Sequence, residues 1–307
     1  MQDGERRLEN QMEKCLDCPR RCGMDRTERL GACRAPAGFL VARIAPHMWE
    51  EPCISGVRGS GTVFFGGCSL GCVFCQNRAI RDGELGELLA PDALLERVEA
   101  LVEGGVHNVN LVTPTHYTRA LVPFLERLRA RVSVPIVWNS SGYESVDMLR
   151  LLDGLVDVYL PDFKYATPEM AAYSHAPDYP EVASSALVEM LRQRGPVRFD
   201  ADGMLESGVL IRHLVLPGGR RDSAAVIRKI AELVPVPDVR LSLMSQYTPD
   251  FVDSNRYPAL ARRVTTFEYQ SVLDLALDLG FEGYFQSRAS ATAAFTPDFD
   301  GNGACGC

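Results

Sequence analysis

The sequence lacks two features that would place the protein in common classes. No run of about 18 apolar residues occurs in its 307 residues, so no conventional membrane-spanning helix is expected. Positive charge is not in excess, because the formal net charge is −8 and the pI is about 5.3. We therefore expect neither a membrane nor nucleic acid as a partner. The opening segment MQDGERRLENQMEKC is charged and lacks the apolar core of a signal peptide, which predicts a cytoplasmic protein.

Composition is otherwise that of an ordinary globular protein. Hydrophobic residues make up 46% of the chain and charged residues 23%, and the chain is long enough to bury a large core. Length alone is compatible with two domains or with one large α/β barrel.

Cysteine, in contrast, is frequent and clustered. The ten cysteines form four groups: Cys15, Cys18, Cys22 and Cys33; Cys53 alone; Cys68, Cys72 and Cys75; and Cys305 with Cys307. In a reducing compartment, clustered cysteines more often bind metal or carry redox chemistry than form structural disulfides. Cys53 is expected to be a small buried residue. The final Cys-x-Cys pair is compatible with a metal site, a dithiol or no function.

Short β-branched apolar runs alternate with longer amphipathic stretches after residue 61. The runs cover residues 62–65, 109–112, 135–138, 156–160, 209–215 and 239–243. The helical stretches cover residues 91–103, 118–131, 145–153, 168–194 (as one helix or two), 222–233 and 266–279. This alternation predicts parallel β/α units. Because six units are too few for a closed eight-stranded barrel, we predict an α/β fold with a partial (β/α)6 barrel of parallel strands.

The chain divides into three predicted segments. Residues 1–60 form an N-terminal Cys-rich extension, residues 61–295 the partial barrel, and residues 296–307 a flexible Gly/Cys tail. A short polar helix is expected over residues 1–14. Residues 15–60 have so little apolar periodicity that a bound metal is expected to stabilise them.

The extension carries a set of four possible metal ligands. Cys15, Cys18, Cys22 and Cys33 have spacings that suit tetrahedral zinc, and the same thiolates could hold iron or a second iron–sulfur cluster. Unligated thiols in a loop are the alternative. Arg20 and Arg21 next to these thiolates are expected to offset part of their charge.

The central motif is TVFFGGCSLGCVFCQN, which begins at Thr62. A predicted strand runs into a glycine turn, and Cys68, Cys72 and Cys75 follow at spacings of four and three. An ordinary [4Fe–4S] cluster takes four Cys ligands, so a cluster held by these three would leave one iron open to a substrate or cofactor. The loop follows a strand, at the end of the sheet where barrel enzymes place their chemistry. A zinc loop and three packed thiols are the alternatives.

This motif resembles the signature of the radical S-adenosylmethionine (SAM) superfamily, Cys-x-x-x-Cys-x-aromatic-Cys, with Phe74 as the aromatic residue. The resemblance implies a [4Fe–4S] cluster on Cys68, Cys72 and Cys75, with SAM on the open iron and Phe74 near the adenine. Reductive cleavage would then give a 5′-deoxyadenosyl radical that abstracts hydrogen from a substrate. Over residues 15–290 the chain is similar to the pyruvate formate-lyase activating-enzyme-like (PflX-type) group. The matching segments are CLDCPRRCGMDR, EEPCISGVRGSGTVFFGGCSLGCVFCQN, NVNLVTPTH, PDFKY and RHLVLPG.

The later strand ends are expected to line the cofactor pocket. The resemblance implies cofactor contacts from Thr113 and Thr115 (amino group), Asn139, Ser140 and Ser141 (ribose), Asp162, Lys164 and Arg212 (carboxylate), and Gln246 (adenine edge). Many family members carry Gly-Gly-Glu where Thr113 and Thr115 stand. His116 and Tyr247 are the candidate catalytic residues. His116 could instead face solvent or cap a loop, and Tyr247 could simply pack in the core. Strand alternation places His213 on the face opposite Arg212, so His213 is expected to be structural.

The sequence therefore predicts a radical SAM oxidoreductase that resembles activating enzymes. One candidate substrate is a backbone glycine of a glycyl-radical-type protein, and the other is a small molecule or another peptide. The resemblance favours the first by analogy only, because fold similarity does not fix a substrate. A third hypothesis assigns the protein to a different functional class. It would then be a non-catalytic iron–sulfur or zinc protein that acts as a redox sensor or carrier. Besides its substrate, the expected partner is a reductant such as flavodoxin or ferredoxin.

Overall fold

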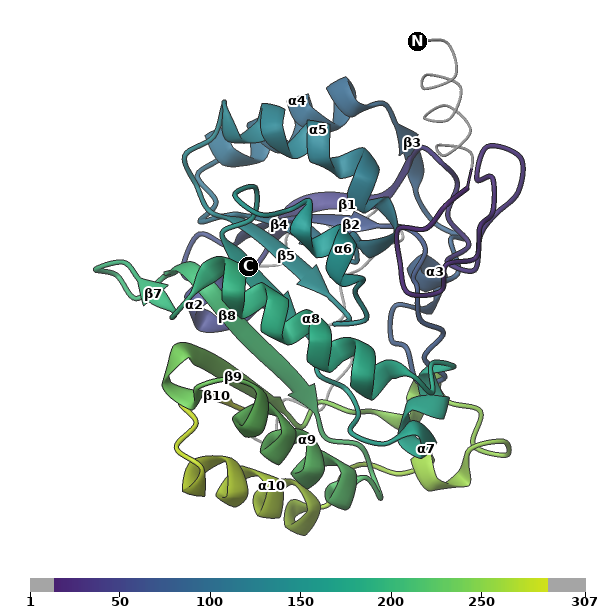
Figure 1. Cartoon of the computed structure of the whole chain (residues 1–307), viewed down its shortest axis with the longest axis vertical. Helices are drawn as coiled ribbons and strands as arrows, with labels where there is room; N and C mark the ends of the chain where they lie inside the picture. Colours follow the sequence, from purple (N-terminus) through teal and green to yellow (C-terminus); the bar gives the residue numbers. More distant parts are fainter. Residues whose placement is uncertain (1–13, 287–307) are drawn as a thin grey trace.

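The computed structural model of the protein describes residues 14–286 and is built around one mixed sheet (Figure 1). The strand order is β10-β9-β8-β6-β5-β4-β2-β1-β3, with β7 (Arg198–Phe199) paired to β8 outside this path. The predicted tail over residues 296–307, with Cys305 and Cys307, lies outside the described residues. So does the predicted polar helix, except for its last residue. No described helix is long and apolar enough to span a membrane.

The six predicted strands are all present and adjacent. They are β2 (Ser60–Phe65), β4 (Val109–Val112), β5 (Ile136–Ser140), β6 (Val158–Pro161), β8 (Leu205–Leu214) and β9 (Val239–Met244). Each pairs in parallel with the next. Their central residues are almost entirely buried, because helices cover one face and the barrel interior the other. The prediction of a parallel α/β sheet is confirmed.

Three further strands of the sheet were not predicted. β1 (Phe39–His47) pairs antiparallel with β2, and β3 (Glu87–Leu89) pairs antiparallel with β1. At the other edge, the short β10 (Gly283–Phe285) pairs in parallel with β9. Residues 39–47 of the predicted extension therefore belong to the same sheet as the barrel strands.

The helices lie on the outer face of the sheet (Figure 1). They are α4 (Pro91–Glu103), α5 (Thr118–Arg129), α6 (Val146–Arg150), α7 (Pro168–Ala171), α8 (Tyr179–Arg194), α9 (Arg220–Leu233) and α10 (Thr266–Asp278). In α5 the buried residues Leu121, Leu125 and Leu128 recur at helical spacing and face the core. The predicted stretch 168–194 is two helices, because His175 adopts a left-handed conformation (φ 54°) between them.

A short segment closes the barrel interior at the amino ends of the strands. The last residue of β1, His47, pairs with the first residue of β2, so the chain leaves β1 at that end. It then enters α2 (Pro52–Ser55), which lies opposite α3 (Arg78–Arg81) in Figure 1. Cys53 and Ile54 are buried there against inward-facing residues of β5, β6 and β8. We call residues 50–55 the floor segment.

The Cys-rich segment before β1 has no regular secondary structure. Two arginines attach it to the barrel. Arg20 donates to the carbonyls of Ser69 (2.8 Å) and His175 (2.6 Å), and Arg26 donates to the carbonyls of Ala35 and His116. The guanidinium of Arg20 thus contacts the barrel. The guanidinium that lies near a cysteine of this segment is that of Arg26, whose Nη1 is 3.8 Å from Sγ of Cys15.

Candidate functional site

A cavity of about 400 Å³ opens between the loop after β2 and the floor segment. Most of the predicted site residues line it: Cys68, Cys72, Phe74, Cys75, Thr113, Asn139, Ser140, Ser141, Asp162, Lys164, Arg212, Gln246 and Tyr247. They come from a continuous loop and from the ends of β4, β5, β6, β8 and β9. Parallel strands bring their carboxyl ends to one edge, which explains why residues so far apart in the sequence converge.

The loop that carries the three cysteines needs glycine at its start. Gly67 has φ +87°, and a Cβ there would lie 2.7 Å from both the Cβ of Ala35 and the carbonyl oxygen of Cys33. The turn therefore lets the N–H of Cys68 donate to that Cys33 carbonyl (3.0 Å). This contact places the predicted N-terminal cysteine set directly against the cysteine loop.

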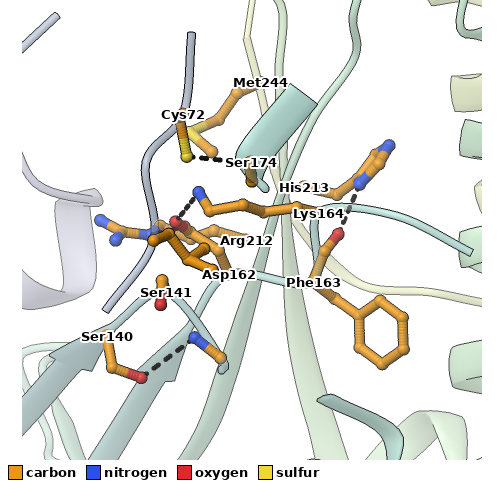
Figure 2. Close-up of polar contacts among 12 residues, drawn as sticks. Cys72, Ser140, Ser141, Asp162, Phe163, Lys164, Ser174, Arg212, His213 and Met244 are labelled. Carbon is orange, nitrogen blue, oxygen red and sulfur yellow. Dashed lines mark hydrogen bonds and ion pairs between the residues drawn. The ribbon is translucent and has the colours of Figure 1, made fainter. Parts of the chain in front are cut away.

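The three thiols of the loop fit the ligands of an iron–sulfur cluster. Burial raises the pKa of Cys68 far above its ordinary range and that of Cys75 to about 11. Sγ of Cys72 lies 2.9 Å from Oγ of Ser174 (Figure 2). No group of three His, Cys, Asp or Glu side chains within residues 14–286 is arranged around a single metal ion. Each thiolate of a cluster binds a different iron, so these three need not converge on one point.

A buried ionic network lines the cavity close to this loop. Asp162 accepts hydrogen bonds from Nζ of Lys164 (2.5 Å) and Nε of Arg212 (3.0 Å), as Figure 2 shows for the lysine. Burial alone would raise the pKa of Asp162, but Lys164 and Arg212 hold it below its ordinary value. Nη2 of Arg212 also donates to Oδ1 of Asn139 (2.6 Å). Lys164 retains two further N–H donors for an anionic ligand.

The floor segment adds two carboxylates that were not predicted. Glu50 accepts from Asn110 (3.2 Å) and Asn139 (3.1 Å), and it pairs with Nη1 of Arg212 (3.2 Å). Its neighbour Glu51 also lines the cavity. In the sequence, these two residues lie in the segment 15–60, which has little periodicity from which a site could be predicted. The resemblance of EEPCISG was the only available signal that they matter.

Two predicted residues do not reach the cavity. Thr115 Oγ1 donates to Glu144 (2.7 Å) on the outer side of the sheet. His116 is fully buried behind the glycine turn, where Nε2 lies 2.9 Å from the carbonyl oxygen of Gly66. Burial, with Arg26 nearby, lowers the pKa of His116 to about 3, so it is neutral at physiological pH. The reason is the backbone: Thr113 has φ +59° and turns the chain away after β4.

Two of the aromatic residues that line the cavity pack against each other. Phe74 and Tyr247 meet edge to face, with ring centroids 6.0 Å apart. The hydroxyl of Tyr247 donates to the carbonyl of Leu260 (2.6 Å), so the ring rather than the hydroxyl is the part available to a ligand. On β8, His213 is buried and hydrogen-bonded to the carbonyl of Phe163 (2.7 Å), which confirms its predicted structural place.

The four N-terminal cysteines lie near one another. A Cβ on Gly31 would be 3.3 Å from Sγ of Cys22 and 3.7 Å from Sγ of Cys33. Burial, together with the charges of the other three thiolates, raises the pKa of Cys18 to about 12. The four sulfurs thus lie close enough to interact electrostatically, but no three of these described side chains converge on a single metal ion.

Comparisons with known proteins identify the family of this chain. An uncharacterized protein of Methanocaldococcus jannaschii is 28% identical over 278 residues, which cover 87% of this chain and 75% of that protein. A radical SAM methyltransferase from Sphaerobacter thermophilus aligns with a TM-score of 0.47 and 14% identity, over 73% of this chain and 65% of that one, slightly under two thirds of its length. The family model of the radical SAM superfamily matches residues 62–218, just over half of the chain. The chain therefore belongs to the radical SAM superfamily.

Proposed function

We propose that this chain is a radical SAM oxidoreductase that removes a hydrogen atom from a substrate bound in the cavity. Membership of the superfamily implies SAM cleavage at a [4Fe–4S] cluster, and when bound these groups supply a 5′-deoxyadenosyl radical. The observation that carries the proposal is that Cys68, Cys72 and Cys75 line the same cavity as Lys164 and Arg212. A redox sensor or metal carrier would have no need of a cavity lined in this way.

The protein's own contribution is binding and orientation. Lys164 and Arg212 are held in place by Asp162, so they are ready to bind a carboxylate without further ordering. Asn139, Ser140 and Ser141 supply hydrogen-bonding groups on the neighbouring strand end. Phe74 and Tyr247 offer flat apolar surface for a base, and together these side chains limit the access of water.

The direct test is release of 5′-deoxyadenosine. Protein reconstituted anaerobically with iron and sulfide, then mixed with SAM and dithionite, should release it at a rate proportional to enzyme concentration. Heat-inactivated protein treated in the same way is the control. Failure of fully reconstituted protein to cleave SAM would refute the oxidoreductase function.

The floor of the cavity favours a small polar substrate over a glycyl-radical-type protein. A glycine loop inserted into the cavity would present only neutral peptide groups to Glu50, Glu51 and Arg212. Deuterium transfer into 5′-deoxyadenosine from labelled candidates would identify the hydrogen donor. A glycyl-radical doublet in the electron paramagnetic resonance spectrum of a partner protein would instead select the activating reaction.

We propose a small acidic electron carrier, such as flavodoxin or ferredoxin, as the reductant. A second hollow lies on the outer side of the cysteine loop, where it is lined by Cys68, Ser69 and several arginines. Arg34, Arg78 and Arg256 are exposed there, although the chain as a whole has a net charge of −8. Local positive charge beside a redox centre accelerates association with an acidic partner.

Reversal of this charge should slow reduction by the protein carrier alone. In an Arg34→Glu/Arg256→Glu variant, flavodoxin-driven cleavage of SAM should fall about tenfold at low salt, and the difference should shrink as salt is added. Dithionite-driven cleavage serves as the internal reference. Arg127→Glu, on the exposed face of α5, is the matched control and should behave as wild type. An equal loss with both reductants would contradict a docking role.

We also propose that Cys15, Cys18, Cys22 and Cys33 bind zinc or an iron–sulfur cluster. Their proximity in a segment without regular structure supports this, because four unpaired thiols alone would stabilise such a segment little.

Metal analysis can isolate this site from the central loop. A Cys68→Ala/Cys72→Ala/Cys75→Ala variant should retain zinc or iron in proportion to protein, since four thiolates remain. Additional replacement of Cys18 and Cys33 by alanine should remove that metal and lower the thermal midpoint. A triple variant that holds neither metal would refute the second site.

A further inference from the structure

The inner part of the cavity holds more acidic than basic side chains. Glu50, Glu51 and Asp162 supply three carboxylates, and Lys164 and Arg212 supply two cations. The remaining lining arginine, Arg81, is paired with Asp82 (2.6 Å) and lies behind the cysteine loop.

The unmatched carboxylate is Glu51. Asp162 forms ion pairs with both Lys164 and Arg212, and Glu50 also forms an ion pair with Arg212. Burial raises the pKa of Glu51, and the charge of Arg212 and a hydrogen bond with Ser242 offset only part of this shift. Its other oxygen, Oε2, is buried and has no hydrogen-bond partner among residues 14–286. A buried carboxylate oxygen without a partner is costly, so the fold places this group where something outside the chain can satisfy it.

The floor segment carries Glu51 into the cavity from the amino ends of the strands. Glu51 precedes α2 at the amino ends of the strands, whereas the cysteines follow the carboxyl end of β2. Ser242, its hydrogen-bond partner, lies on β9 beside Arg212 of β8. A cofactor held at the cysteine loop would therefore leave the carboxylate of Glu51 facing the remaining space, where a substrate would bind.

We propose that Glu51 binds a positively charged nitrogen of the substrate, so that the substrate is a small organic cation such as an amine or a guanidine. This inference rests on the proposed function, because it assigns the substrate class of the same site. The positive charges of Arg212 and Lys164 repel a cation elsewhere in the cavity. The charged end of the substrate is therefore oriented towards the floor segment.

The test measures binding of simple probes to the reconstituted full-length protein saturated with S-adenosylhomocysteine. Butylammonium and butylguanidinium should bind at least about tenfold more tightly than 1-butanol or butyrate, because only cations can pair with Glu51. Glu51→Gln should remove this preference, whereas Glu51→Asp should retain part of it. Glu206→Gln, the same change at an exposed position of β8, should leave it intact.

The outcomes separate this inference from the proposed function. Equal binding of cationic and neutral probes by the wild type, or a preference that survives in Glu51→Gln, would overturn it. A tenfold weaker affinity of that variant for S-adenosylhomocysteine would also overturn it, because Glu51 would then serve the cofactor. Release of 5′-deoxyadenosine by the wild type is an independent readout, so its failure refutes the reaction and leaves the cation site standing.

Discussion

Cys72→Ala should reduce the release of 5′-deoxyadenosine from reconstituted protein to the level of an enzyme-free control. With only two of the three loop thiolates left, the cluster loses a protein ligand that nothing else in the loop replaces. Cys72 is largely buried, and its Sγ contacts Ser174. We therefore expect the variant to lose the cluster, which would lower both its iron content and its absorbance near 400 nm.

The matched control for this loss is Cys53→Ala. Cys53 is also a buried free cysteine, but it lies in the floor segment among apolar side chains. Its replacement removes one buried sulfur and should leave iron content and cleavage close to those of wild type. Cleavage by Cys72→Ala at a rate near that of wild type would mean that this cysteine does not hold the cluster.

Much of the fold follows from local sequence pattern. The six parallel strands are continuous apolar runs because both of their faces are covered, and such runs are visible in the sequence. β1 was missed because Arg43 and Pro46 interrupt its apolar residues. Both lie beyond the part of β1 that pairs with β3, where half-exposed positions are tolerated. β10 has only three residues, too few for any periodicity to show.

The site was predictable to the extent that it depends on strand ends. The cysteine loop is contiguous, and Asp162 and Arg212 are brought together by the parallel pairing of β6 and β8. Glu50 and Glu51 reach the cavity only because β1 runs antiparallel and delivers the floor segment to the opposite end. That placement depends on tertiary pairing, which local pattern does not contain.

Glu144 is expected to make the stability of the protein fall as pH rises from about 4.5 to about 7. Burial raises the pKa of this carboxyl from its ordinary 4.5 to about 7, against hydrogen bonds from Thr115 and Trp138. Between these values the folded state holds a proton that the unfolded state has released, so each step up in pH favours unfolding. A shift of this size corresponds to about 3 kcal/mol of stability, present in full below pH 4.5 and lost above pH 7.

Glu144→Gln should flatten this part of the profile, because its amide does not titrate. Urea unfolding at pH 5 and at pH 8 measures both proteins, and the variant should lose about 2.5 kcal/mol less than the wild type between the two values. Glu103→Gln, at the exposed end of α4, should keep the wild-type slope. The same slope in Glu144→Gln would show that the carboxyl is hydrated in solution. Oε2 of Glu144, which is buried without a partner among the described residues, would then have to accept hydrogen bonds from water.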